Sequence, residues 1–333
     1  MVVLVSGGAG YIGSHAVRAL SAAGHTPVVI DNFSTGHREF VSGIDCVEAD
    51  VGDKAAVTDA VKKHGIEAAM HFASFINVGD SVHDPRSYYE NNVASGIRFI
   101  SALQEAEVKK FILSSTCAVY GSLGEIRPLS EKDAIQPINP YAACKRMLET
   151  VLTDFCAAYD FHAVVFRYFN ASGAMENGDI GEWHEPETHL IPNILRSAKS
   201  ADAAPLKVFG NDYPIPGGDG TAVRDYIHVS DLVTAHVQGL EYLLSHKGIH
   251  TFNLGTGQGA SVLAVIRATE STLGKKIHYD IHPRRAGDAP YLVADSAHAL
   301  QELGWQPKYS DLTTILRTAA AWENKLETIR NRH

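Results

Sequence analysis

The sequence predicts an α/β protein in which a doubly wound parallel sheet is followed by a smaller α+β region. In the first half of the chain, short apolar runs alternate with helix-length segments; the runs are "VVLV", "PVVI", "AAMHF", "KFILSS" and "AVVFRYF". Continuous apolar runs of this kind are typical of parallel strands that are buried on both faces. After Phe169 the alternation is lost, and turn-rich stretches such as "YPIPGGDG" separate short mixed elements.

This change of pattern divides the chain into two predicted regions. Residues 1–172 are expected to form the sheet region, and residues 173–333 the smaller region. The stretch 222–247, which contains "RDYIHVSDLVTAHVQGL", is expected to pack back onto the first region, and a last helix is expected from about Leu312.

Composition excludes several classes of function. The chain has 333 residues, 45% of them hydrophobic and 20% charged, which is enough for a sizeable core. Its net charge of -9 argues against nonspecific binding of nucleic acid or of an anionic membrane. The four cysteines form no C-x-x-C pair, and neither a signal peptide nor a membrane-spanning run is recognisable. We therefore expect a soluble cytoplasmic protein.

The first strand leads into a glycine-rich turn. "VVLVSGGAGYIGSH" places Gly7, Gly10 and Gly13 between a strand and a helix that starts near Ile12. Glycines permit a tight turn and a close backbone approach, and the free N–H groups of the helix start can bind a pyrophosphate. Asp31 ends the next strand, where a carboxylate can accept hydrogen bonds from ribose hydroxyls and repel a 2′-phosphate. The pattern predicts a Rossmann-type fold that binds NAD rather than NADP; a purely structural turn is the alternative.

The fourth apolar run, "KFILSS", is followed by a helix with an unusual lysine. In "INPYAACKRML", Asn139 and Pro140 form a helix start, and the stripe that turns inward contains Tyr141 and Lys145. An ammonium one turn away, together with the positive nicotinamide ring of an oxidised cofactor, would favour the phenolate of the tyrosine. A buried tyrosine with a lysine that extends to the surface is the alternative.

Taken together, these motifs resemble those of the extended short-chain dehydrogenase/reductases, and within them the UDP-glucose 4-epimerase family. Matching stretches run along nearly the whole chain, among them "GGAGYIGSH", "SSTCAVYG", "NPYAACK", "RYFNASGA", "VRDYIHVSDL" and "RRAGD". The resemblance implies that Tyr141 takes the proton of the sugar 4-hydroxyl while NAD receives the hydride from C4. Thr116 would hydrogen-bond the reacting oxygen, and Lys145 would hold the nicotinamide ribose and lower the pKa of the tyrosine.

The resemblance also implies two sets of binding residues. By this similarity the NAD site would be lined by the following residues: Gly7, Gly10, Tyr11, Ile12, Gly13, Asp31, Asn32, Asp50, Val51, Phe72, Ala73, Ser74, Asn91, Ser114, Tyr141, Lys145, Tyr168 and Phe169. The nucleotide sugar would be held by Thr116, Tyr141, Asn170, His189, Leu190, Phe209, Arg224, Arg285 and Asp288. Arginines can clamp a diphosphate, and a carboxylate can receive ribose hydroxyls.

Some positions depart from the family pattern. Ile76 stands where some relatives place a lysine near the cofactor phosphates, and the loop before Arg224 is slightly longer than usual. Leu292 occupies a position at which side-chain bulk limits N-acetylated sugars, so that specificity stays open.

The histidine-rich segment "GEWHEPETH" is interpreted as a substrate-site loop without a metal. A zinc-protease helix would need its second histidine at position 188, which is a threonine, and Pro186 would break the helix. Cys117 is expected to be a small buried residue rather than a nucleophile.

Several alternatives for function remain. Related dehydratases carry an Asp-Glu pair after the threonine and related decarboxylases a Glu, but Cys117 and Ala118 occupy those positions and cannot act as acid or base. UDP-galactose and UDP-glucose are the expected substrates, with UDP-arabinose and UDP-xylose, or dual specificity, as the alternative. A catalytically silent NAD-binding protein is the third possibility. The helices near Tyr88–Glu105 and from Pro140 suggest a homodimer of the kind that this family forms.

Overall fold

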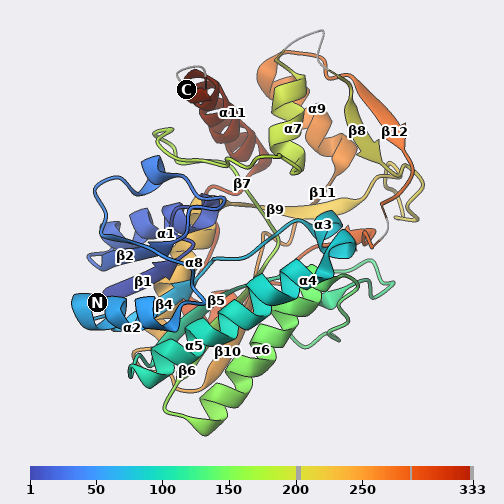
Figure 1. Cartoon of the computed structure of the whole chain (residues 1–333). Helices are drawn as coiled ribbons and strands as arrows, with labels where there is room; N and C mark the ends of the chain where they lie inside the picture. Colours follow the sequence, from blue (N-terminus) through green and yellow to red (C-terminus); the bar gives the residue numbers. More distant parts are fainter. Residues whose placement is uncertain (200–203, 286, 331–333) are drawn as a thin grey trace.

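The centre of the fold is a seven-stranded parallel sheet with the strand order β10-β6-β5-β4-β1-β2-β3 (Figure 1). The structure, a computed structural model, describes residues 1–199, 204–285 and 287–330. The strands of the sheet are β1 (Val2–Ser6), β2 (Thr26–Asp31), β3 (Cys46–Glu48), β4 (Ala68–His71), β5 (Lys110–Thr116), β6 (His162–Tyr168) and β10 (Ile249–Leu254). The chain reverses its direction of winding between β1 and β4, as in doubly wound folds. This confirms the predicted fold class.

Helices cover both faces of the sheet. The helices α1 (Tyr11–Ala22) and α8 (Val229–Tyr242) pack against each other over one face, and α2 (Lys54–His64), α5 (Ser95–Glu105) and α6 (Pro140–Ala158) pack over the other. Successive residues of β1 separate the two cores, because Val3 and Val5 enter one apolar cluster and Leu4 enters the other. A strand buried on both faces needs such an uninterrupted apolar run.

The predicted helix before β5 is divided into segments. The helices α3 (Val78–His83) and α4 (Pro85–Tyr88) are followed by the π-helical segment η2 (Tyr89–Ala94), which leads into α5. Short 3-10 turns, η1 (Arg38–Val41) and η3 (Cys117–Tyr120), follow β2 and β5.

The second region combines short strands with helices over a core of its own. β9 (Val223–His228) pairs with β7 (Asn170–Ser172), β11 (Gly259–Ser261) and β13 (Tyr291–Leu292), and β8 (Leu206–Phe209) pairs with β12 (Tyr279–His282). The helices α7 (Leu190–Ser197), α9 (Val262–Leu273) and α11 (Leu312–Arg330) pack together around the apolar cluster that includes Ile194, Val265 and Leu316. This region has the mixed α+β character that was predicted.

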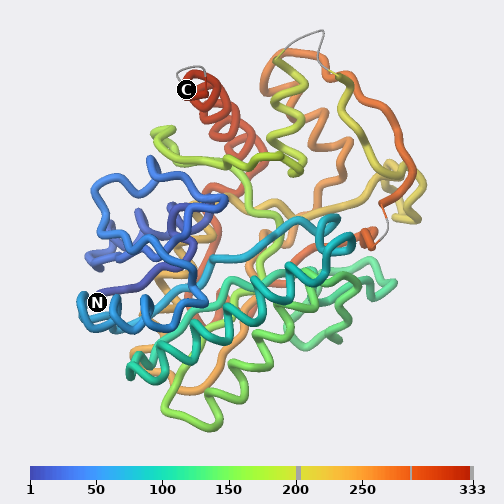
Figure 2. The backbone as a smooth tube through the Cα atoms, in the orientation of Figure 1, coloured from blue at the N-terminus to red at the C-terminus, as the bar shows by residue number. Residues whose placement is uncertain are grey.

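The main sheet extends further along the chain than the sequence suggested. The expected return of 222–247 brings α8 onto α1, but β10 and α10 (Ala297–Leu303), which lie beyond that stretch, also join the first region. The orange segment of β10 in Figure 2 therefore runs beside the green segment of β6. Within the described residues, no helix has the length and apolar character needed to cross a membrane.

Candidate active site

The glycine turn between β1 and α1 is shaped by two close backbone approaches. Gly7 has φ +68°, and a Cβ atom there would lie 2.6 Å from the backbone nitrogen of Ala73. A Cβ atom on Gly13 would lie 2.1 Å from the carbonyl oxygen of Gly7. Among the described residues no side chain caps the start of α1, so its first N–H groups are available to an anion. The predicted glycines therefore form a cradle at a helix start with free N–H groups, an arrangement that can bind a pyrophosphate.

Asp31 is fixed to this turn by hydrogen bonds. Its carboxylate accepts the N–H groups of Ala9 and Phe33 at 2.9 and 2.8 Å. Burial raises the pKa of Asp31, and these two hydrogen bonds oppose the rise. Next to it, the amide nitrogen of Asn32 donates to the carboxylate of Asp50 at 3.1 Å.

The other residues expected at the cofactor lie mainly at the carboxyl ends of neighbouring strands. Positions after β3 and β4, within or after β5 and β6, and in η2 are occupied by Asp50, Val51, Phe72, Ala73, Ser74, Asn91, Ser114, Tyr168 and Phe169. In parallel sheets this edge, at the reversal between β1 and β4, is where a dinucleotide binds. Tyr11 differs from the others, because its hydroxyl donates to the carbonyl oxygen of Gly173 at 2.7 Å and its side chain is buried. Tyr11 can therefore offer the cofactor only its backbone. The adjacent Ile12 lies in the first turn of α1, and its side chain is half-buried.

Thr116 and Tyr141 come together from two elements. Thr116 ends β5, and Tyr141 stands in the first turn of α6, where the side chain of Asn139 caps the helix by accepting the N–H of Ala142 at 2.9 Å. Burial raises the pKa of Tyr141 well above its usual value, and its hydrogen bond with Thr116 lowers the pKa in part. Without further positive charge the phenol is held protonated, next to a hydroxyl that can share its proton.

Lys145 is buried under the end of β5. Its ammonium donates a hydrogen bond to the carbonyl oxygen of Ser114 at 2.9 Å, and only 1% of the residue is exposed. Burial lowers the pKa of Lys145 to about 8, against the opposing effects of Cys144 and Glu149. The alternative of a lysine extending to the surface is wrong. The hydroxyls of Ser114 and Tyr168 are also in direct contact, which links β5 and β6 beside the lysine.

The residues expected at the nucleotide come together at the second region. The guanidinium of Arg224, on β9, forms an ion pair with the carboxylate of Asp288. The guanidinium of Arg285 lies 3.8 Å from the centre of the Phe209 ring, which ends β8. Leu292 pairs with Arg224 in the sheet register. An aromatic face, two guanidiniums and a carboxylate form a suitable surface for a base, a diphosphate and a ribose.

Asn170 and Leu190, two further residues expected at the nucleotide sugar, are each partly buried. Asn170 begins β7 and is paired with Tyr226 of β9, and Leu190 begins α7.

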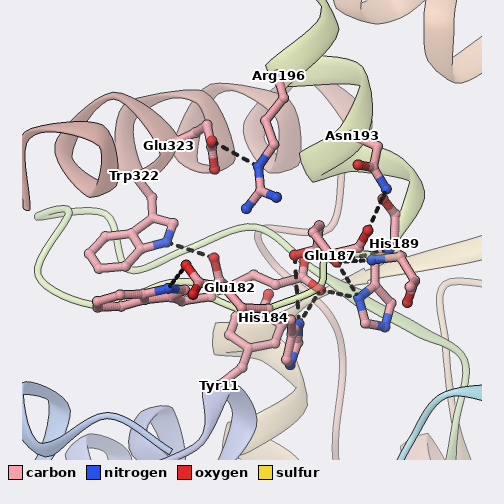
Figure 3. Close-up of polar contacts among 12 residues, drawn as sticks. Tyr11, Glu182, His184, Glu187, His189, Asn193, Arg196, Trp322 and Glu323 are labelled. Atoms are coloured by element: carbon pink, nitrogen blue, oxygen red, sulfur yellow. Dashed lines mark hydrogen bonds and ion pairs between the residues drawn. The ribbon is translucent and has the colours of Figure 1, made fainter. Parts of the chain in front are cut away.

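His189 occupies the start of α7 but turns one nitrogen toward carboxylates (Figure 3). Its Nδ1 lies 2.9 Å from Glu182 Oε1 and 2.8 Å from Glu187 Oε1. Burial by itself would lower the pKa of His189, but the two carboxylates raise it to about 10. The segment "GEWHEPETH" is a loop. The comparison with a zinc-protease helix, by which a metal site was rejected from the sequence, therefore does not apply to it.

A buried ion pair beneath the site was not predicted. The Glu149 carboxylate accepts Arg167 Nε and one terminal guanidinium nitrogen at 3.0 and 2.7 Å, and it accepts the Ser115 hydroxyl at 2.6 Å. Tyr120 accepts another nitrogen of the same guanidinium at 3.1 Å. Two signals were available in the sequence: an arginine inside the apolar run "AVVFRYF", and a glutamate one turn after Lys145 on the inward stripe.

Cys117 is buried, and burial raises the pKa of its thiol to about 12. A thiol of this kind is a poor nucleophile.

The site therefore offers a phenol, a hydroxyl and an ammonium beside a cradle for a dinucleotide. Such a set can remove a proton from an alcohol while hydride leaves the same carbon.

Comparison with known proteins agrees with this geometry. The curated UDP-glucose 4-epimerase of Rhizobium leguminosarum bv. trifolii is 47% identical over 97% of both chains. A crystal structure of the UDP-glucose 4-epimerase of Brucella ovis, in complex with NAD, has a TM-score of 0.91 at 44% identity and covers 96% of this chain and 97% of its own. A crystal structure of the UDP-glucose-4-epimerase of Stenotrophomonas maltophila, with bound NAD and formylated UDP-arabinopyranose, has a TM-score of 0.94 at 38% identity and covers 99% of both chains.

The profile of one family spans most of the chain. The profile described as the NAD dependent epimerase/dehydratase family matches residues 3–255, which include the glycine turn, Thr116, Tyr141 and Lys145. The chain belongs to the NAD dependent epimerase/dehydratase family.

Proposed function

We propose that this protein is an NAD-dependent isomerase that interconverts UDP-galactose and UDP-glucose by inverting carbon 4 through a transient 4-keto sugar. The observation that carries the proposal is that Tyr141 lies next to Thr116, on the helix that also bears the buried Lys145, at the edge of the sheet that bears the glycine turn. Curated relatives that are 40–47% identical to this chain bear the name UDP-glucose 4-epimerase. The positions after Thr116 are Cys117 and Ala118, which supply no acid or base for loss of water.

The cofactor site fits NAD. The cradle of Gly7, Gly10 and Gly13 suits a pyrophosphate, and Asp31 suits unphosphorylated ribose hydroxyls. When bound, NAD accepts hydride from carbon 4 of the sugar and returns it to the other face. Lys145 would direct its ammonium to the nicotinamide ribose as well as to the Ser114 carbonyl. The remaining cofactor contacts named from the sequence stay part of the proposal.

The proton is handled by two hydroxyl groups of the chain. Tyr141 accepts the proton of the sugar 4-hydroxyl, and Thr116 hydrogen-bonds the same oxygen and stabilises the transfer. Because burial raises the pKa of Tyr141, the phenolate must be favoured by positive charge supplied in the loaded site. In the return step the same phenol gives the proton back to the oxygen at carbon 4.

The nucleotide is assigned to the second region. Phe209, Arg224, Arg285 and Asp288 would hold the UDP group, with Asn170, His189 and Leu190 nearer to the sugar. The Arg224–Asp288 ion pair would have to open or be shared when diphosphate and ribose bind. Because the residues assigned to UDP lie after residue 172, we also propose that the chain divides there into a cofactor region and a nucleotide-sugar region.

A pentose substrate is not favoured, because the curated relatives are named for glucose.

We also propose a homodimer in the cytoplasm. The exposed apolar side chains of Tyr89 on η2 and Met147 on α6, two elements that pack together, would suit a helical interface.

The decisive experiment is product analysis with Tyr141→Phe. Wild-type protein, incubated with UDP-galactose and no added NAD, is expected to form UDP-glucose at a constant final ratio. The variant is expected to lose about 10²–10⁴-fold in kcat while retaining NAD, because the proton acceptor is gone and the cradle is intact.

Tyr159→Phe, an exposed tyrosine at the end of the same helix, serves as the matched control and should turn over normally. Unchanged turnover in Tyr141→Phe would remove this residue as the base. If the wild type converts no UDP-sugar even with added NAD, the silent NAD-binding alternative takes the place of the epimerase.

A further inference from the structure

The loop before α7 gathers two histidines and two glutamates into one cluster beside Tyr11 (Figure 3). One nitrogen or oxygen ligand atom from each side chain lies within 4.8 Å of all the others. The members of this cluster are Glu182, His184, Glu187 and His189.

Two atoms of the cluster are buried without a hydrogen bond. Glu187 Oε1 accepts the backbone N–H groups of Thr188 and His189, each at 2.8 Å, which fixes the carboxylate. Its other oxygen, Oε2, and the Nδ1 atom of His184 have no hydrogen-bond partner among the described residues, and the Glu187 side chain is only 1% exposed. A buried polar atom without a partner is unfavourable, so this arrangement points to a missing ligand.

The spacing of these atoms suits a single metal ion. His184 Nδ1 lies 3.7 Å from Glu187 Oε2 and 3.4 Å from Glu182 Oε1, and His189 Nδ1 lies 2.9 Å from Glu182 Oε1. Two ligands of a tetrahedral ion with bonds of about 2.0–2.1 Å are separated by about 3.3–3.4 Å. The two distances from His184 are near this separation, and 3.7 Å is too long for a hydrogen bond. The 2.9 Å distance from His189 is that of a hydrogen bond, so its ring has to shift when an ion enters.

The donor set selects the kind of ion. Imidazole nitrogen with carboxylate oxygen suits zinc and its first-row neighbours, whereas calcium and magnesium prefer oxygen alone. With neutral histidines the cluster carries two negative charges in a largely buried place, which one divalent cation neutralises. We propose that Glu182, His184, Glu187 and His189 form a site for one divalent transition-metal ion of the zinc type.

Surrounding contacts hold the ligands in place. Asn193 donates to the carbonyl oxygens of Glu187 and His189 at 3.3 and 2.9 Å, and the Trp322 indole donates to the carbonyl oxygen of Glu182 at 2.8 Å. Partners of this kind orient ligands and tune their affinity. The loop is thereby anchored to α7 and to α11 before any ion binds.

The ion would be structural rather than reactive. Four protein ligands leave no open position for substrate, as in structural zinc sites. The ring of His184 lies edge-on to Tyr11, 6.3 Å between centres, and Tyr11 is in the first turn of α1. An ion here would therefore clamp the second region against the glycine turn. The inference does not depend on the proposed hydride and proton transfer, and with an ion bound His189 would serve as its ligand instead of contacting the sugar.

Cobalt binding to tag-free protein, stripped with EDTA and still holding its cofactor, tests the proposal. We expect one equivalent of Co²⁺ to bind with the intense visible absorption of a four-coordinate ion, and Zn²⁺ to displace it and raise Tm. Glu187→Gln should weaken binding by about 100-fold or more, since loss of even an outer-shell partner costs about 10–100-fold.

Glu185→Gln provides the matched control. It lies in the same loop, but its carboxylate contacts Trp183 and Arg330 instead of the cluster, so it should bind Co²⁺ like the wild type. If Glu187→Gln fails to fold, His184→Asn, at a side chain that is 20% exposed, gives the same comparison. The proposal is overturned if the wild type binds no Co²⁺ with these spectra, or if the Glu185 and Glu187 variants lose affinity alike. The cluster would then be a network of ion pairs with protonated histidines.

Discussion

A buried ammonium is costly, and Lys145 shows that cost. Burial lowers its pKa to about 8 from an ordinary value near 10.5, so the folded, cofactor-free protein disfavours the charged form. Its hydrogen bond to the Ser114 carbonyl compensates for only part of the lost hydration. The residue is better suited to the loaded site, where further acceptors for its donors would be present.

This leads to a prediction for Lys145→Met in the protein freed of NAD. We expect the free energy of unfolding at pH 7 to rise by about 1–2 kcal/mol, because a desolvated charge is replaced by an apolar chain of similar length. Turnover should fall by at least about 10²-fold. Urea unfolding and product analysis measure the two effects.

The expected pH dependence follows from the same shift. Between about pH 8 and 10.5 the unfolded chain holds the proton more tightly than the folded protein does, so wild-type stability rises with pH. The difference in the free energy of unfolding between Lys145→Met and the wild type should therefore shrink from pH 8 to pH 10.5. A variant that is less stable than the wild type at pH 7 would show that the ammonium stabilises the empty fold.

At the scale of elements, α6 and β6 are joined by the buried Glu149–Arg167 pair. Both side chains are almost fully buried, with 4% and 6% exposed, and each is satisfied by several hydrogen bonds. Replacing one partner leaves an uncompensated buried charge, which costs about 3–5 kcal/mol, whereas replacing both by apolar residues costs far less.

We therefore expect Glu149→Leu and Arg167→Met each to lower the free energy of unfolding by about 3–5 kcal/mol. The double variant should recover at least about half of the summed loss, because the two residues interact directly. Denaturant unfolding of the four proteins measures this coupling. Strictly additive losses would mean that the pair acts only through its separate neighbours.

Elements with strong local patterns could be predicted from the sequence, and those defined by distant partners could not. The runs that became β1, β5 and β6 contain the continuous apolar stretches "VVLV", "FIL" and "AVVF", and Asn139–Pro140 marks the start of α6. By contrast, β3 has only three residues, "CVE", and is a strand because it pairs with β2 at the edge of the sheet. The π-helical turns of η2 leave no mark in the periodicity of the sequence.

The histidine-rich loop shows the same limit at the site. A helical spacing rule was applied to a segment that is not helical, so the rule could not foresee that Glu182 and His189 would meet. The same holds for Phe209 and Arg285, which are brought together by the pairing of β8 with β12. For these residues only the family resemblance pointed to a shared site.

At the scale of the whole molecule, three buried histidines make stability depend on pH. Burial lowers the pKa of His15 to about 4, of His71 to about 3 and of His236 to about 4. In the unfolded chain each takes up a proton near pH 6.5. As the pH falls from 6.5 toward 4, the unfolded state therefore binds more protons than the folded one, and stability is lost over that range.

His236 is the clearest of the three for a test, because it lies among aromatic rings of the main core. Its ring centre is 5.0 Å from that of Phe72 and 4.8 Å from that of Phe166, and its Nδ1 lies 2.9 Å from the Leu232 carbonyl oxygen of its own helix. We expect His236→Leu to reduce the loss of stability between pH 6.5 and pH 4.5 by about 1.4 kcal/mol per pH unit, the contribution of one proton. Urea unfolding at several pH values gives that slope. Val233→Ala, on the same helix, should lower stability at every pH without changing the slope; if both variants keep the wild-type slope, the buried imidazole of His236 is not one of the groups through which acid destabilises the fold.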